Sequence, residues 1–334
     1  MRLIALLIFL FLLVVPKINQ AQKSESDSAT INQISITTDS LLQLSSSKKY
    51  SFWHRSDTFN QRRFTFVLGS TTLALAASYV YVKNAWWGDQ TNRFHFDGGT
   101  GIQHLFTFGN DAKYAKNLDK FGHFYGGIFY SDLFSNAAMW SGVKKQKAYL
   151  WGGILGTCIQ GFVEIKDGYS PTWGFSTYDL LAGSLGSFYP YFQTKSKFLA
   201  ATDVKFSYYK VDDYYFKDIQ YKAKWNDDYM NQTYWLTFNP KRFNKNWNWP
   251  KWLGISAGFG VDNKLNNYYI GTADNYADHG KGGYEFFIAP DIDFKGLLPK
   301  KPIWQKIGHV LNYVKFPAPT IRLSNNSRFF PIYF

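Results

Sequence analysis

The chain has few acidic residues, a single cysteine and little charge overall. Of its 334 residues, 24 are Asp or Glu, and charged residues make up 18%, below the roughly 25% of a soluble domain. Because Cys158 stands alone, a disulfide scaffold and a thiolate zinc site are excluded. Aromatic residues reach 20%, so most of the chain can bury a large apolar surface and is not disordered. We expect Cys158, which lies inside an apolar segment, to serve in packing.

The formal net charge is +13, which by itself would fit nucleic-acid binding. The Lys and Arg residues are scattered, however, and no RNA- or DNA-binding signature accompanies them. Basic chains rich in Trp and Tyr also suit anionic membrane surfaces, where aromatic rings lie among the headgroups. We therefore expect membrane lipids or other envelope components as partners and no nucleic acid, while protein partners cannot be read from the sequence.

Residues 1–22 have the pattern of a signal peptide, with Arg2, a thirteen-residue apolar run from Leu3 to Val15, and Pro16. An uncleaved anchor is the alternative. No Cys follows the run, so we expect export without a lipid anchor. Residues 23–50 are rich in Ser and Thr and read as a solvated linker. The protein is thus predicted to be exported to the envelope of a Gram-negative-type bacterium and to face the periplasm, with the inner and outer membranes both open.

Four apolar segments then predict a helical domain over residues 51–195, a small membrane-type bundle of about four helices. They are Phe64 to Val82, Phe121 to Gly142, Ala148 to Ile165 and Asp179 to Phe192. Trp86 and Trp87 follow the first segment, where interfacial anchors are expected. The other three segments carry Gly at several positions, which lets helices in lipid approach closely. For the first segment the alternative is a buried helix of a soluble domain. The other three include segments shorter than an ideal span, which leaves shallow or re-entrant insertion open.

The polar residues of these segments gather near their ends. Asp119, Lys120 and His123 open the second segment, and Asp119 and His123 share a helix face because they are four apart. Gln160 and Glu164 repeat this spacing at the end of the third segment. The remaining members, in the next loop and at the start of the fourth helix, are Asp167, Ser170 and Asp179, the last in capping-box spacing with Ser176. In an up-down-up bundle all of them can meet at one end.

Three explanations of this cluster stay open. It could be a self-neutralising network of caps and ion pairs, or a pocket at the membrane surface in which His123 or Glu164 acts as general acid or base. It could also hold a divalent metal. The metal ligands would be His123, Glu164, Asp167 and Asp179. Lys120 argues against the metal, because its ammonium competes for the same carboxylates; we expect it to pair with Asp119 or Asp167. No other cofactor is indicated.

These residues also carry a family resemblance. The segments 119–124, 164–170 and 174–180, with Gly183 and Gly186, resemble the YfiM-like family, a domain of unknown function described as predicted periplasmic lipoproteins or membrane proteins. More distantly the pattern is similar to VanZ-like membrane proteins, which are linked to glycopeptide-antibiotic resistance. The resemblance covers roughly residues 90–195. It implies a fold and a location but no reaction. Gly183 replaces the Asn that is usual in the family. The sequence also has no Cys after the signal run, so the lipoprotein description does not transfer.

The last part of the chain, residues 196–334, is predicted to be a β-rich domain, which makes the fold class α+β. Short aromatic and β-branched runs alternate with turn residues. The runs are Val204 to Val211, Tyr234 to Phe238, Leu253 to Val261, Tyr284 to Ile292 and Thr320 to Leu323. Trp304 to Tyr313 predicts a short amphipathic helix. The module is either a periplasmic domain packed on the bundle or a set of outer-membrane strands.

Together these features predict an envelope protein of membrane or membrane-associated type that is structural or binding in function. The alternative is a membrane-surface enzyme or lipid-handling protein that uses the polar cluster, with or without a divalent metal. Whether the chain is an enzyme is left open, since no nucleotide loop and no nucleophile–base–acid order stands out.

Overall fold

A computed structural model describes residues 52–87, 92–106, 114–171, 173–209, 228–261, 283–324 and 327–334. The expected signal peptide 1–22 and linker 23–50 lie outside the described residues. The chain divides into two units, Met1–His54 and Arg55–Phe334. Only Phe52 to His54 of the first unit are described, so the architecture below is that of the second.

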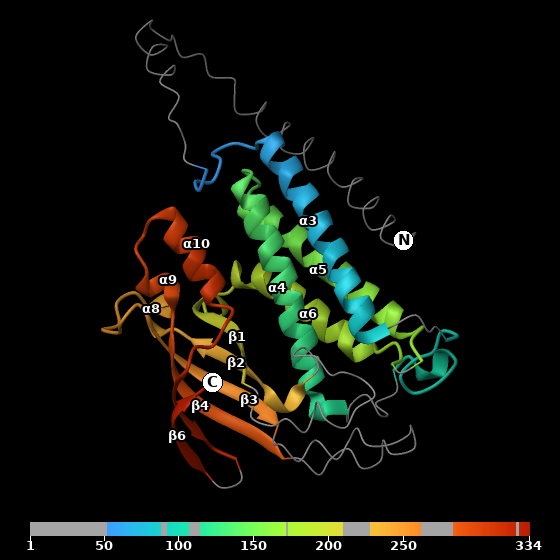
Figure 1. The fold of residues 1–334 in the computed structure, drawn as a ribbon. Coiled ribbons are helices and arrows are strands. Elements are labelled where there is room, and N and C mark those ends of the chain that lie inside the picture. Colours follow the sequence, from blue (N-terminus) through green and yellow to red (C-terminus); the bar gives the residue numbers. More distant parts are fainter. Residues whose placement is uncertain are drawn as a thin grey trace, which may run out of the picture. The chain divides into compact units, whose positions relative to one another are not determined.

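Each of the four apolar segments forms a helix. They are α3 (Gln61–Val82), α4 (Leu118–Trp140), α5 (Lys145–Asp167) and α6 (Thr177–Gln193). α4 contacts the other three and also reaches the sheet, so it runs through the middle of the unit (Figure 1). It ends at Trp140, two residues before the segment predicted from the sequence, because Gly142 adopts a positive φ of 94°.

Glycine allows α4 and α6 to approach closely, as the sequence predicts. A Cβ added at Gly127 of α4 would lie 2.2 Å from the carbonyl oxygen of Gly183, and one added at Gly186 of α6 would lie 1.9 Å from the carbonyl oxygen of Phe124. Both distances are too short for any side chain. The two backbones are therefore in direct contact, which larger residues would prevent.

The expectation of four membrane-type helices is wrong. Among the described helices, only α3 is long and apolar enough to cross a membrane. α6 has 17 residues, fewer than the roughly 20 that a span needs. α4 and α5 have 23 residues each, but polar residues such as Asp132 and Gln160, together with glycine, lower their mean hydropathy.

Short helical elements connect and flank the main ones. They are η1 (Lys83–Trp87), η2 (Ile102–His104), η3 (Tyr114–Asn117), η4 (Leu199–Ala201), η5 (Tyr229–Asn231), α8 (Pro240–Phe243), α9 (Phe294–Leu297) and α10 (Pro302–Leu311). The last confirms the helix predicted between Trp304 and Tyr313, which begins two residues earlier with Pro302 in its first turn.

The C-terminal part forms one antiparallel sheet in which the strands follow their order along the chain. The strands are β1 (Thr202–Tyr208), β2 (Gln232–Phe238), β3 (Leu253–Val261), β4 (Tyr284–Ile292), β5 (Ala318–Arg322) and β6 (Arg328–Tyr333). β3 and β4 have the predicted bounds. β6 is an additional strand that the sequence did not predict. Its Pro331 argues against a strand in the sequence, but proline is tolerated in an edge strand such as β6. The α+β fold class is confirmed.

The sheet is strongly curved, so that its far strand comes back toward its first strands. The Tyr333 ring of β6 lies 4.6 Å from Phe287 and 6.0 Å from Trp235, and its hydroxyl is 3.2 Å from the Thr233 hydroxyl of β2. Beyond β1, the segment at Val314 pairs with Phe206. The curved sheet therefore encloses a small core of its own.

A second core joins the sheet to the start of α4. Its buried residues are Ala115, Leu118, Tyr229, Tyr234 and Val261. Tyr125 of α4 packs on Phe206 at a ring distance of 5.7 Å and donates a hydrogen bond to the Tyr313 carbonyl. The bundle and the sheet therefore meet at the same end of α4 as the predicted polar cluster.

Candidate functional site

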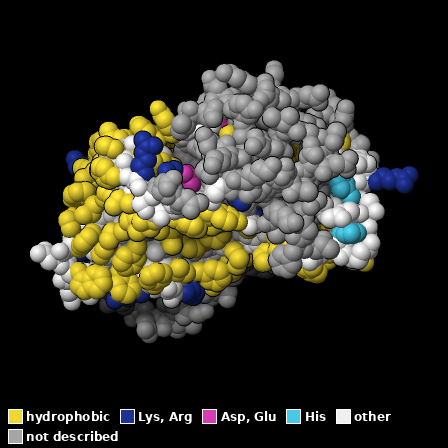
Figure 2. All heavy atoms as spheres, turned by 90° about the horizontal axis from the view of Figure 1, so that it is seen from below, with side chains coloured by type: hydrophobic (Ala, Val, Ile, Leu, Met, Phe, Trp, Pro, Cys, Tyr) yellow, Lys and Arg dark blue, Asp and Glu magenta, His cyan; other side chains and the backbone are white. Residues whose placement is uncertain are grey.

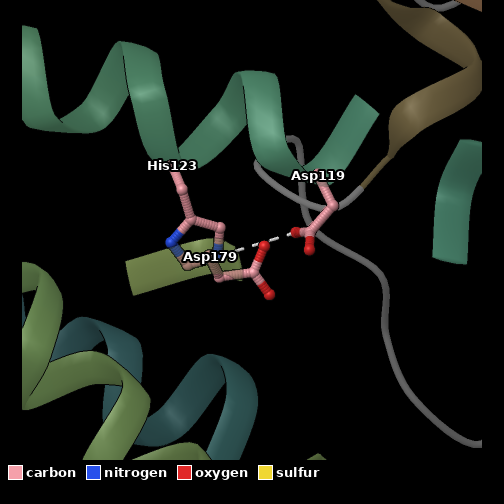
Figure 3. A group of neighbouring side chains, drawn as sticks. All are labelled: Asp119, His123 and Asp179. Atoms are coloured by element: carbon pink, nitrogen blue, oxygen red, sulfur yellow. Dashed lines mark ion pairs between the residues drawn. The ribbon is translucent and has the colours of Figure 1, made fainter. Parts of the chain in front are cut away.

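The structure brings most of the predicted polar residues together where α4 begins, α5 ends and α6 begins. The Lys120 ammonium lies at the centre of the carboxylates, 2.9 Å from Oδ1 of Asp179 and 3.3 Å from Oδ2 of Asp119. Figure 3 shows Asp119 and His123 projecting from α4 toward Asp179 of α6. The convergence inferred from helix-end spacing is therefore present in the fold.

The His123 imidazole contacts α5 through Nδ1 and Asp119 of its own helix through Nε2. Nδ1 lies 3.0 Å from Oε1 of Gln160 and 3.5 Å from Oε1 of Glu164. Nε2 lies 3.7 Å from Oδ1 of Asp119 in the preceding turn of the same helix. The i, i+4 spacings at 119/123 and 160/164 thus put four side chains on two facing helix surfaces.

Glu164 also fixes the start of α6. The Ser176 amide donates to Oε2 of Glu164 at 3.0 Å, and the Asp179 amide donates to the Ser176 hydroxyl at 3.0 Å. The predicted Ser176 cap is confirmed, but the expected return bond from the Asp179 carboxylate is replaced by Glu164 of another helix. Asp179 is thereby left to pair with Lys120. Glu164 is 1% exposed, and its Oε1 has no hydrogen-bond partner.

Asp167 and Ser170 lie beside this group rather than within it. The indole N–H of Trp87 donates to Oδ1 of Asp167 at 2.6 Å, and Trp87 is buried. The expectation of Trp87 as an interfacial anchor is therefore wrong. Lys120 pairs with Asp119 and Asp179 and not with Asp167. Ser170 is buried in the loop after α5, where its hydroxyl accepts from the Trp173 amide.

The charges within the cluster shift one another's protonation. Burial, with repulsion from Asp179 and Asp167, holds the pKa of Glu164 well above 4.5. Burial alone would lower the pKa of His123, but the carboxylates of Asp179 and Asp119 and the Gln160 bond raise it above 6.5. For Asp119, burial is outweighed by Lys120, His123 and Tyr229, and its pKa is lowered. The cluster therefore favours the protonated forms of both Glu164 and His123 relative to free side chains.

A divalent metal would find its best ligand set in Asp119, His123 and Asp179. One ligand atom from each lies within 4.8 Å of the others. This set differs from the predicted one, since it includes Asp119 and leaves out Glu164 and Asp167. The Lys120 ammonium already lies in hydrogen-bond range of both carboxylates, so a cation would have to displace it. The donor set fits a metal only after that displacement.

The structure also shows the surroundings of Cys158 and Gly183, two residues named in the sequence analysis. Cys158 is exposed on α5, so the expectation that it serves in packing is wrong. A Cβ at Gly183 would lie 2.5 Å from Cγ of Gln160. The glutamine side chain thus fills the space that a larger residue at position 183 would need.

Sequence analysis missed a second polar group, which joins α4 to α10. Nε2 of His309 and the Tyr313 hydroxyl both lie 2.6 Å from Oδ2 of Asp132, and Asn136 donates to Oδ1 at 2.8 Å. Burial opposes ionisation of Asp132, but the His309 and Tyr313 contacts lower its pKa. Asp132 is an ionisable residue within an apolar segment, but its partners His309 and Tyr313 lie more than 170 residues away.

Comparison with known proteins gives a family for part of the chain. Residues 107–195 match a family described as "Predicted periplasmic lipoprotein (DUF2279)". This part of the chain is similar to an envelope family of unknown function. The match contains every member of the polar cluster on α4, α5 and α6, and it supports an exported protein of the Gram-negative cell envelope. It does not extend to the YfiM-like and VanZ-like resemblances, which stay predictions. No curated protein and no solved structure matches the chain.

Proposed function

We propose that this chain is a membrane-associated structural or binding protein of the cell envelope, attached through α3. The observation that carries this proposal is the surface of α3. Its 22 residues include only two that are buried, Phe64 and Val67. Leu73 and Phe66 are 73% and 63% exposed. A helix at a water-facing surface would turn polar residues outward, whereas a helix in lipid exposes apolar ones.

The ends of α3 support the same orientation. No charged residue lies between Phe64 and Val82, while Arg62, Arg63 and Lys83 flank the apolar stretch. Arg63 is held against the bundle, since it donates to the Trp140 carbonyl and lies 4.7 Å from that ring. Basic residues at both ends of an apolar helix suit the headgroup layers. The polar cluster then has a structural role, because it holds the ends of three helices together beside the anchor.

The experiment compares envelope fractions from cells that express the wild-type chain and a Leu73→Glu, Val80→Glu variant. The two substitutions put one carboxylate in the middle of α3 and one in its last turn. Carboxylates within an apolar helix are costly in lipid but not in water. We expect the wild-type protein to stay with membranes after an alkaline wash and the variant to appear folded in the soluble fraction. A Leu73→Met variant is the matched control and should behave like the wild type. A wild-type protein that washes off, or a variant that stays bound, would contradict attachment through α3.

A second candidate function is a proton-transferring or amphiphile-binding site at the cluster, with or without a metal. The favouring observation is the unsatisfied Oε1 of Glu164 at 3.5 Å from Nδ1 of His123, since perturbed acid–base pairs gather at functional sites. Glu164→Gln and His123→Ala separate the two readings. If both variants fold normally but envelope integrity is lost, the cluster is a site. If both lose folded protein, it is structural.

A further inference from the structure

The inner side of the sheet holds a buried ion network beside the small aromatic core of Trp235 and Phe287. Lys205 of β1 is 0% exposed, and its ammonium lies 2.7 Å from Oδ2 of Asp291 on β4. The Thr237 hydroxyl of β2 donates to the same oxygen at 2.6 Å. Lys315 lies 3.7 Å from the other oxygen of Asp291 and 5.0 Å from the Trp235 ring. The interior of the curved sheet thus holds a buried ion pair beside its aromatic core.

The outer side of the same strands is apolar and exposed. Strand register places Leu236, Ala257, Ile288, Ile321 and Phe329 in one row across β2 to β6. The large members of this outer face are Leu236, Ile255, Phe286, Ile288, Ile321 and Phe329, each between 45% and 61% exposed. In Figure 2 the hydrophobic side chains form a broad area with few charges on the side where β4 and β6 lie.

Within the described residues, α4 covers only the part of this outer face formed by β1, β2 and the end of β3. Phe121 stacks on Phe259 at 4.7 Å, and Tyr125 packs on Phe206. The row continues past these contacts toward β6, where Ile288, Ile321 and Phe329 stay between 45% and 61% exposed. A continuous apolar surface of this extent marks an interaction site rather than a solvated face.

The connections at one end of the sheet indicate what covers the outer face. The segments that join β2 to β3 and β4 to β5 leave the sheet at the same end, because β2 and β4 run parallel to each other. These segments carry exposed aromatic and basic residues. They are Lys245, Trp247, Lys251, Trp252, Lys300 and Trp304. Indole rings and ammonium groups at the end of an apolar face complement an anionic headgroup layer above acyl chains.

We propose that the outer face of the sheet lies against the acyl chains of the membrane, with the Trp- and Lys-bearing connections at headgroup level. Sheets in contact with lipid expose apolar side chains on their outer face. The outer face of β2, β3 and β4 does so, while their inner face holds Thr237, Ser256 and Asp291 beside Trp235 and Phe287. The inference rests on the proposed attachment of the protein to a membrane and adds a second contact to that of α3. A second copy of the chain is the competing occupant.

The test uses the full-length protein with Cys158→Ser, so that a single new cysteine can carry an NBD fluorophore. Ile288→Cys and Ile321→Cys place the probe on the outer face, and Leu73→Cys places it on α3. Lys145→Cys, at the exposed start of α5, is the matched control. Each protein is reconstituted in vesicles of phosphatidylethanolamine and phosphatidylglycerol with or without bromine on the acyl chains, which quenches a probe in contact with them.

We expect brominated chains to quench the probe at 288, 321 and 73 and to leave the probe at 145 unchanged. Quenching at 73 without quenching at 288 and 321 would overturn the sheet contact and leave the α3 attachment standing. Quenching at 288 and 321 alone would support the sheet contact and refute the α3 attachment, and quenching at none would refute both. Unquenched probes with disulfide cross-linking between Ile321→Cys chains would assign the face to a second copy.

Discussion

The Tyr229 hydroxyl donates a 2.7 Å hydrogen bond to Oδ1 of Asp119, across 110 residues of sequence. Tyr229 belongs to the core between α4 and the sheet, while Asp119 belongs to the polar cluster. This one bond therefore couples the charges at the helix ends to the docking of the sheet. It also lowers the pKa of Asp119 together with Lys120 and His123.

The first prediction concerns this bond. Tyr229→Phe removes the hydroxyl, keeps the ring in its core and leaves a buried carboxylate with one donor fewer. Hydrogen bonds to charged groups contribute about 1.5–3 kcal/mol, so we expect the free energy of unfolding to fall by that amount. Chemical denaturation followed by Trp fluorescence measures it. Tyr125→Phe, which removes a bond to a neutral carbonyl, is the control and should cost less. An equal or smaller loss for Tyr229→Phe would contradict the coupling.

The second prediction concerns the contact between α4 and α6. Gly186→Ala places a methyl group 1.9 Å from the Phe124 carbonyl oxygen, so the helices must separate and the bundle loses stability. Gly161→Ala is the control in α5, where the nearest atom is 3.7 Å away; it should gain about 0.5–1 kcal/mol from helix propensity. The two melting temperatures should move in opposite directions. Similar shifts for both variants would mean that close backbone approach does not hold this pair of helices.

The third prediction is a pH dependence that originates at Asp167. Burial raises the pKa of Asp167 to about 7 from 3.8, against the opposing Trp87 bond. The folded state therefore holds this proton more tightly than the unfolded state, and the free energy of unfolding falls as pH rises from about 4 to 7. In Asp167→Asn the slope of this fall should decrease by about 1.4 kcal/mol per pH unit, which corresponds to one bound proton. Glu164 and His123 act in the same direction and keep some slope in the variant.

Trp87→Phe provides the complementary measurement for Asp167. It removes the hydrogen bond that lowers the pKa of this carboxyl, so the pH-dependent fall should extend above pH 7. Equilibrium unfolding across the pH range gives both slopes. If the slopes of both variants match that of the wild-type protein, Asp167 does not carry the predicted proton.

The sequence predicted the local features of the site well because they depend on short-range spacing. The i, i+4 pairs at 119/123 and 160/164 fix which helix faces meet, and the Ser176 cap forms as expected. The strands β3 and β4 were predicted with their bounds because both are apolar runs that end at turn residues. Glycine in α4 and α6 correctly indicated close helix packing.

The rest depends on partners far apart in the chain, which spacing does not reveal. Asp132 meets His309, and Asp119 meets Tyr229, only after the sheet has docked. Trp87 was expected at an interface because it follows α3, but the chain continues into η1 and turns the ring toward Asp167. The buried ion pair inside the sheet was also hidden, since Lys205 and Asp291 lie 86 positions apart in the sequence.

The central claim, that the polar cluster is a structural network which stabilises the bundle, is tested most directly by the unfolding of Lys120→Met. This variant keeps the length of the side chain but leaves the buried Asp119 and Asp179 carboxylates without the ammonium between them. Loss of one partner of a buried pair costs about 3–5 kcal/mol. In the Lys120→Met, Asp179→Asn double variant one carboxylate is removed as well, so part of the loss should be recovered.

The measurement is the free energy of unfolding of the wild type, Lys120→Met, Asp179→Asn and the double variant under one set of conditions. The account predicts a large loss for Lys120→Met and a double variant that is more stable than Lys120→Met alone. If Lys120→Met unfolds at the same denaturant concentration as the wild type, the cluster does not stabilise the fold, and its charges would then be kept for a bound ligand or ion.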